Sequence, residues 1–263
     1  MKLERYSKKL FSAVSRKGLW LRPLGELERG KYIWLVSKRN TNGDKPNLLI
    51  AGGFHGEEIA GPWSILKWIE VCDTKTFVDV NISLLPVVNP TGFDKYKRKN
   101  KWDERTNCGF YHPEKRDGLS REGQILLENS ETLFELGKDG FLSLHEDVNT
   151  DKFYIYTFEN STLPGIFSIS LRDEEEKFFD RLKDGEKVNN NGEPDTYVQD
   201  GIVYKLCDGS FEDFLWHKGV PRTATIEIPG KFPLHRRVKA GVSLIFKFIE
   251  VSKELASKRE GWR

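Results

Sequence analysis

The feature that most constrains the fold is the alternation of short apolar runs with amphipathic segments. The clearest run is 48–51, Leu-Leu-Ile-Ala, which ends in two glycines. It is followed, at helical spacing, by Ile59, Trp63, Leu66 and Ile69. An apolar run that ends in glycine is typical of a buried strand, and the spacing after it predicts a helix. Strands that alternate with helices predict an α/β fold around a largely parallel or mixed sheet.

The rest of the chain fits the same architecture. Further strands are expected at about 24–27, 32–36, 78–88, 141–145, 153–158 and 223–228. Helices are expected over the first 17 residues or so, from 59 onwards, over 120–138 and 172–183, and near the C-terminus. Polar segments at 89–118 and 189–196 are expected to be loops. No internal repeat is visible, and 263 residues suffice for one large core, so we expect one domain over 1–263.

Composition narrows the classes of function. Lys and Arg number 42 against 40 Asp and Glu, so charge gives no argument for a nucleic acid or an acidic membrane as partner. No apolar run approaches the roughly 18 residues of a membrane helix, and the basic N-terminus lacks the apolar segment of a secretory signal. Three cysteines are too few for a disulfide framework. We therefore expect a soluble, cytoplasmic protein.

Metal-ligating residue types follow two of the expected strands. His55 and Glu58 come directly after the strand at 48–51, and His145 ends the strand at 141–145. Ligands of open α/β sheets bind beyond the carboxyl ends of strands. Two histidines and one carboxylate, with one position left open, are the ligands of a catalytic zinc site. Zinc held in this way lowers the pKa of its water to about 7 and polarises a carbonyl.

A further carboxylate is needed to accept the proton of that water, and Glu227 is the candidate. It stands between Ile226 and Ile228 in an apolar, alternating strand, where a carboxylate needs a partner or a function. Each of these signals is weak alone, because His-x-x-Glu pairs are common and a histidine at a strand end is more often a hydrogen-bonded core residue. Their joint order along the chain is what favours a zinc site.

These residues belong to a longer series of motifs that resembles the zinc metallocarboxypeptidase family over roughly 45–230. Five segments carry the resemblance. Gly53–Glu58 resembles the family's G-x-H-x-x-E metal motif, and Val88–Phe93 resembles its N-P-D-G-[FY] turn. Ser143–His145 resembles the strand of the third ligand. Tyr204–Asp213 resembles the segment of the mobile tyrosine followed by G-S-x-D, and Thr225–Glu227 resembles the strand of the catalytic glutamate.

The resemblance implies a fold and a set of roles. The fold is a mixed, mostly parallel eight-stranded sheet sandwiched between helices. One Zn²⁺ per chain is held by His55, Glu58 and His145. Glu227 activates the water and returns the proton to the leaving amine. By the same resemblance, Arg98 stabilises the oxyanion and Tyr204 caps the substrate.

The resemblance also implies a substrate pocket, with Asn107 positioning the substrate carboxylate and specificity depending on residues around Phe211. Here the sequence departs from the family. Cys108 occupies the position of an arginine that grips the terminal carboxylate, and Arg105 occupies that of an aspartate that supports the first histidine. Either the loop is re-registered, with Asp103 supporting His55 and Arg105 gripping the carboxylate, or no free terminal carboxylate is required.

The predicted function is a zinc metallopeptidase of carboxypeptidase type, which hydrolyses an amide bond at or near the C-terminus of a small peptide. One alternative is an N-acyl amino acid deacylase of the aspartoacylase and succinylglutamate desuccinylase type. Another is a relative that binds zinc or peptide without catalysis, although Arg98, Tyr204 and Glu227 count against it.

Four further residues are of types that can bind metals or act in catalysis, but a structural explanation is favoured for each. Glu146 and Asp147 follow His145 and are more simply solvated acids than ligands of a second metal. Cys207 is expected to pack or to line the pocket, and His217 to lie on the surface.

Overall fold

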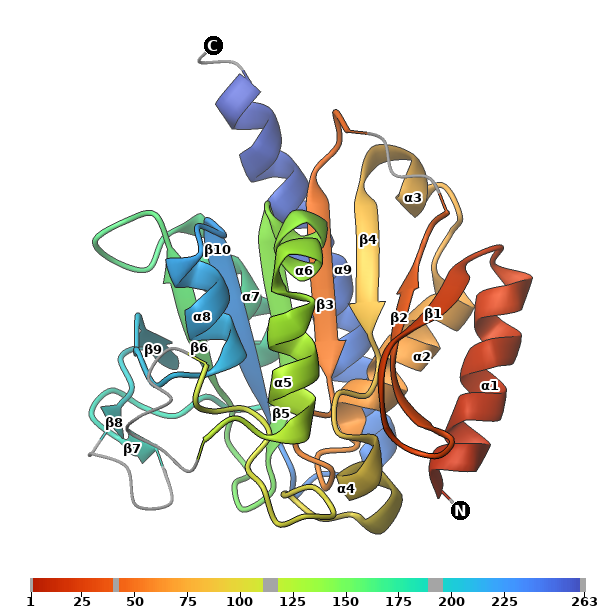
Figure 1. The fold of residues 1–263 in the computed structure, drawn as a ribbon. Coiled ribbons are helices and arrows are strands. Elements are labelled where there is room, and N and C mark those ends of the chain that lie inside the picture. The colour runs from red at the N-terminus through yellow and green to blue at the C-terminus, as the bar shows by residue number, and fades with distance from the viewer. Residues whose placement is uncertain (1, 40–42, 111–117, 189–195, 261–263) are drawn as a thin grey trace.

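A mixed eight-stranded sheet forms the centre of the molecule (Figure 1). The computed structural model describes residues 2–39, 43–110, 118–188 and 196–260. The strand order is β1-β2-β4-β3-β5-β10-β6-β9. The strands are β1 (Trp20–Glu28), β2 (Lys31–Ser37), β3 (Asn47–Gly52), β4 (Asn81–Leu85), β5 (Gly140–Asp147), β6 (Tyr154–Glu159), β9 (Ile202–Tyr204) and β10 (Arg222–Pro229). β7 (Lys187–Val188) and β8 (Thr196–Tyr197) form a separate two-stranded ribbon.

The central strands run parallel and the outer strands bring in the antiparallel pairs. β4, β3, β5 and β10 are parallel neighbours, and β9 runs parallel to β6. β1 with β2, β2 with β4, and β10 with β6 are antiparallel. The predicted mixed, mostly parallel eight-stranded sheet is confirmed. One consequence is that β3, β5 and β10 all end at the same edge of the sheet.

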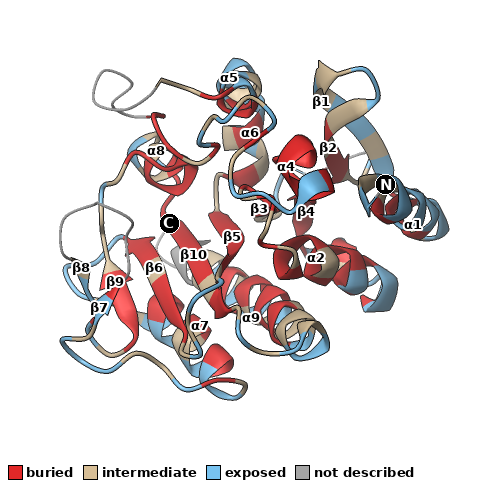
Figure 2. Cartoon of the chain, turned by 90° about the horizontal axis from the view of Figure 1, so that it is seen from below, coloured by how far each residue is buried: buried red, intermediate tan, exposed pale blue. Residues whose placement is uncertain are grey.

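Helices cover both faces of the sheet (Figures 1 and 2). One face carries α1 (Lys2–Arg16), α2 (Ala60–Val71), α7 (Ile166–Glu176) and α9 (Leu234–Glu260). The other carries α5 (Arg121–Glu128), α6 (Ser130–Gly137) and α8 (Phe211–His217). Two short helices, α3 (Thr76–Asp79) and α4 (Pro90–Lys95), lie in connections. None of the described helices has the length and the apolar character needed to cross a membrane.

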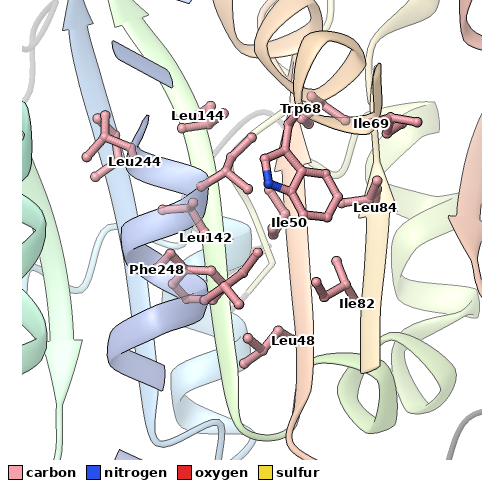
Figure 3. Packing of buried hydrophobic residues seen from close by; sticks show 14 of the residues in the cluster. Leu48, Ile50, Trp68, Ile69, Ile82, Leu84, Leu142, Leu144, Leu244 and Phe248 are labelled. Carbon is pink, nitrogen blue, oxygen red and sulfur yellow. The ribbon is translucent and has the colours of Figure 1, made fainter. Parts of the chain in front are cut away.

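The core is formed on both faces by alternate residues of the central strands. Leu48 and Ile50 of β3 belong to the cluster that contains Trp68 and Phe248, and Figure 3 shows these side chains packed between sheet and helices. Leu49, the residue between them, faces the other cluster. Each fully buried side chain of this kind contributes about 1.5–3 kcal/mol. The apolar character of β3 on both faces explains why its sequence is a continuous apolar run.

Several elements differ from the sequence prediction. The predicted strand at 78–88 begins with the short helix α3, and the predicted helix at 120–138 is divided at Asn129 into α5 and α6. α7 begins at Ile166, earlier than predicted, because Phe167 and Leu171 pack into the core. α4, β9 and α8 were not predicted. The expected loop at 189–196 lies outside the described residues except for Thr196, which begins β8.

Candidate metal and catalytic site

Strand register places three functional side chains in a row at the carboxyl edge of the sheet. His145 of β5 is the partner of Glu227 on the parallel strand β10. Glu227 is in turn the partner of Tyr154 on β6. Paired residues on neighbouring strands direct their side chains to the same face, so the three side chains share one face of the sheet.

The loop after β3 brings the other two predicted ligands to this edge. His55 and Glu58 lie between the end of β3 and the start of α2. The loop packs tightly on α4, because a Cβ at Gly56 would lie 2.0 Å from the carbonyl carbon of Gly92. Gly53, at the start of the loop, has a φ of +66°, which favours glycine. These two glycines let the loop turn sharply and press against its neighbour.

The turn at 88–93 supports the same loop. The Asn89 side chain caps α4 by accepting a hydrogen bond from the Gly92 amide at 2.8 Å. The Asn89 amide donates to the Gly53 carbonyl at 2.8 Å, and its side-chain nitrogen donates to the Arg98 carbonyl at 3.3 Å. This motif is therefore structural, because it joins the loop of His55 to the segment of Arg98.

His55, Glu58 and His145 converge on one point. Their ligand atoms all lie within 4.8 Å of one another. Nδ1 of His55 lies 2.6 Å from Oε1 of Glu58, and Nδ1 of His145 lies 2.9 Å from Oε2 of the same carboxylate. Glu58 and His145 are each about 1% exposed. The structure thus assembles two imidazoles around one buried carboxylate.

This group fits a zinc ion. Both ring nitrogens of His145 are buried, and neither forms a hydrogen bond of acceptable geometry with the described protein atoms. An unsatisfied buried polar group costs about 1–3 kcal/mol, and a metal bound at Nδ1 would remove part of that cost. Two imidazoles and one carboxylate are the donor types of catalytic zinc sites.

The charges in the group suit a cation. Burial alone would raise the pKa of Glu58, but His55 and His145 hold it well below its usual range. Burial lowers the pKa of His55 to about 4, so this imidazole is neutral at pH 7, the form that binds metals. Burial would also lower the pKa of His145, but the carboxylates of Glu58 and Glu212 raise it well above its usual value. A bound cation would displace that proton.

Glu227 is the strand partner of His145 but is not one of the three converging residues. Burial raises its pKa to about 8, against the opposing charges of His145 and Arg98. A buried carboxylate that has a pKa near neutrality and lies outside the ligand group is suited to proton transfer. A cation held nearby would move that pKa back down.

A cavity of about 280 Å³ opens over these residues. Arg98, Arg105 and Asn107 lie in its lining, as do three aromatic residues of β6: Tyr154, Tyr156 and Phe158. Arg98 donates from Nη1 to Oε1 of Glu58 at 3.0 Å. Asn107 accepts from the Phe211 amide at 3.0 Å and donates to Glu212 at 3.1 Å. The cavity therefore combines acidic, basic and aromatic surfaces.

Besides Glu58, three of the residues expected at the site lie outside the cavity lining. The Tyr204 hydroxyl lies 2.9 Å from the carbonyl oxygen of Ser161 and 3.1 Å from that of Glu159, and shares its one proton between these two acceptors. Cys108 is 2% exposed, with its sulfur 3.7 Å from the Arg105 carbonyl. Phe211 is fully buried in an aromatic cluster, while its neighbours Ser210 and Glu212 line the cavity. Capping of a substrate by Tyr204 would require its present hydrogen bonds to break.

Asp103 and Glu146 are both engaged elsewhere. The Asp103 carboxylate is exposed and forms an ion pair with Lys99 at 2.9 Å, so it does not support His55. This ion pair excludes the re-registered loop arrangement in which Asp103 supports His55. Glu146 accepts from the Ala60 amide at 2.6 Å and forms an ion pair with Arg237, which are structural contacts.

Glu212 is a residue at the site that the sequence did not reveal. It is 2% exposed, and its Oε1 lies 3.6 Å from Nε2 of His145. Burial would raise its pKa, but His145 lowers it to about 2. A carboxylate behind a metal-binding histidine orients the ring and fixes its tautomer. Acids in the first turn of a helix are common, so nothing in the sequence distinguished Glu212 from an ordinary helix start.

A family model and solved structures resemble this chain. Residues 44–117 match the model described as the succinylglutamate desuccinylase/aspartoacylase catalytic domain. A candidate metallopeptidase from Shewanella amazonensis is 38% identical, with a TM-score of 0.88 over 94% of this chain and 92% of its own. One from Shewanella denitrificans is 37% identical, with a TM-score of 0.86 over 94% and 88%.

A more distant structure shares the fold. The metallo-carboxypeptidase of Pseudomonas aeruginosa, solved in complex with (2-guanidinoethylmercapto)succinic acid, is 17% identical, with a TM-score of 0.65 over 96% of this chain and 69% of its own. At that identity the likeness shows the fold alone. No curated protein sequence matches the chain.

Proposed function

Because the chain belongs to the zinc carboxypeptidase-like family, related to the succinylglutamate desuccinylase and aspartoacylase branch, we propose that it is a zinc-dependent peptidase of carboxypeptidase type. Its substrate would be a small peptide, cleaved at an amide bond at or near the C-terminus. The observation that carries the proposal is one cavity lined by His55, His145 and the separate carboxylate of Glu227, with Glu58 in contact with both histidines. The names of the two Shewanella relatives support a peptidase.

In this proposal Glu227 moves the protons. It accepts a proton from the attacking water and returns it to the leaving amine. When bound, a zinc ion would acidify water and polarise the scissile carbonyl. The position of Glu227 beside His145 in the strand register supports its role, because it keeps the carboxylate next to the ligands without making it one of them.

Two arginines of the cavity would bind the substrate. Arg98 would donate to the oxyanion that forms at the carbonyl, and its contact with Glu58 supports this role. Arg105 is exposed and lines the cavity, and a guanidinium there suits a two-pronged contact with a substrate carboxylate. Asn107 has both side-chain atoms engaged and would act through Glu212 rather than on the substrate.

A second candidate is an N-acyl amino acid deacylase. The family model that matches residues 44–117 supports it directly. That segment contains His55, Glu58 and both cavity arginines. The same residues could serve either reaction, because both hydrolyse an amide bond beside a carboxylate.

Metal content and a substrate panel test the proposal together. The protein would be purified without added metal and its zinc measured by elemental mass spectrometry, beside His55→Ala and the matched surface control His235→Ala. We expect an equivalent of zinc that is lost only in His55→Ala. No zinc, even after zinc is supplied, would contradict both candidate functions.

The panel would contain dipeptides, tripeptides and N-acyl amino acids, tested with zinc-loaded protein. Turnover of the peptides supports the peptidase. Turnover confined to N-acyl amino acids would replace it with the deacylase. Zinc binding without any turnover would leave a non-catalytic binding protein.

A further inference from the structure

We infer that Cys207, Asp213 and His217 form a second metal-binding site, suited to zinc or another thiophilic divalent cation. Each of the three offers one ligand atom, and these atoms lie within 4.8 Å of one another. The group is separate from His55, Glu58 and His145. The inference does not depend on the proposed function.

The fold brings the three residues together on one side of the short helix α8. Asp213 and His217 are four residues apart on this helix, so they share one face. Cys207 lies in the segment that joins β9 to α8. That segment turns at Lys205 and Gly209, which have φ values of +53° and +75°, and so brings the cysteine back beside the first turn of the helix.

Asp213 carries the observation that points to a ligand. Its side chain is fully buried. Oδ2 accepts a hydrogen bond from the Gly209 amide at 2.8 Å, which accounts for a structural role at the helix start. Oδ1 is also buried, forms no hydrogen bond of acceptable geometry with the described residues, and lies 2.8 Å from Nδ1 of His217, with the Cys207 thiol as a further neighbour. A carboxylate anchored through one oxygen therefore directs the other oxygen toward the imidazole and the thiol of the group.

The donors and their access fit a metal ion. A thiolate, an imidazole and a carboxylate are all ligand types of zinc, and three of them leave a position for water. Cys207 and His217 are exposed, so a cation can reach the group from solvent. Burial and the nearby acids raise the pKa of the Cys207 thiol, which would release its proton to solvent on binding the metal.

The site adjoins the main cavity, since Cys207 and Asp208 line it. A metal bound by Cys207 and two α8 residues would tie the segment after Tyr204 to that helix. The segment that borders the cavity would then be held in place by metal as well as by its backbone turns.

The sulfur ligand makes the site testable by spectroscopy. Co²⁺ would be titrated into the metal-free protein while the thiolate-to-cobalt charge-transfer absorption is recorded. The His55–Glu58–His145 group contains no sulfur and cannot produce this band. We expect the band in the wild-type protein and in His55→Ala, and its loss in Cys207→Ser. Cys72→Ser, which changes a buried cysteine elsewhere, is the matched control and should keep the band.

Equilibrium dialysis with Zn²⁺ gives the second readout. We expect Cys207→Ser and His217→Ala each to bind one equivalent less than the wild-type protein. Because both residues are exposed, neither substitution is expected to disturb folding. A titration without the charge-transfer band, or a band that persists in Cys207→Ser, would overturn the inference. If the charge-transfer band appears but no zinc binds at the His55–Glu58–His145 group, the proposed function is refuted and the inferred second site stands.

Discussion

Two buried carboxylates in different parts of the molecule, one at the edge of the sheet and one on a helix, have pKa values shifted in opposite directions. Glu58, at the carboxyl edge, and Glu175, on α7, are both at most 1% exposed. The two histidines beside Glu58 hold its pKa below the usual range. Neither oxygen of Glu175 has a hydrogen-bond partner among the described residues, and burial raises its pKa well above the usual value. Burial alone therefore does not make an anionic site, because a buried carboxylate stays charged only where cationic or hydrogen-bonding groups converge on it.

Removing a histidine partner of Glu58 should have the largest effect on metal binding and activity. In His145→Ala the carboxylate keeps only one imidazole, so the metal group is incomplete. We expect loss of the zinc bound at this group and no measurable turnover, checked by elemental mass spectrometry and by assay of the best panel substrate. Retention of both would show that His145 is not a ligand.

Replacing the proton acceptor should leave the metal group intact. Glu227→Gln keeps the shape of the side chain but cannot take a proton, so we expect kcat/KM to fall about 10²–10⁴-fold. Zinc content should equal that of the wild-type protein. Glu57→Gln, which alters another acid of the cavity, is the matched control, and an active Glu227→Gln protein would exclude this base from the mechanism.

Glu212, whose carboxylate faces Nε2 of His145, tests whether a residue beyond the three ligands affects metal binding. Glu212→Gln removes the charge that faces Nε2 of His145, and we expect zinc affinity to fall about 10–100-fold. Competition with a chelator measures this change. Activity at saturating zinc should recover most of its wild-type value, because the substitution acts on metal binding. An unchanged affinity would make Glu212 a packing residue only.

Glu175 is the converse case, where replacing a buried acid should stabilise the fold. With its pKa raised in the folded state, wild-type stability falls as pH rises above the unfolded value of about 4.5. Glu175→Met removes that dependence, so we expect about 1–3 kcal/mol of added stability at pH 8 and less at pH 5. Urea unfolding at both pH values measures it. A variant less stable than wild type at pH 8 would contradict the unpartnered state of Glu175.

Local patterns explain which parts of the molecule could be predicted. The apolar run before Gly52 and the alternation around Glu227 identify buried strands, because each depends on residues close in sequence. The three-residue interval of His55 and Glu58 is equally local. α8 was missed because it is short, and its acids look like an ordinary helix start. Tyr204 was placed by analogy, but its orientation depends on contacts with Glu159 and Ser161, about 45 residues away.

Residue patterns alone were enough to predict the alternation of strands and helices, the mixed sheet, and the loop and strand positions of His55, Glu58, His145 and Glu227. The groups that face these residues depend on how the elements pack together. This packing placed Glu212 behind His145, directed the Tyr204 hydroxyl away from the cavity, and brought Cys207 beside Asp213 and His217. The physical reason is that periodicity reports which face of its own element a residue occupies, whereas pKa and ligand geometry depend on atoms contributed by other elements.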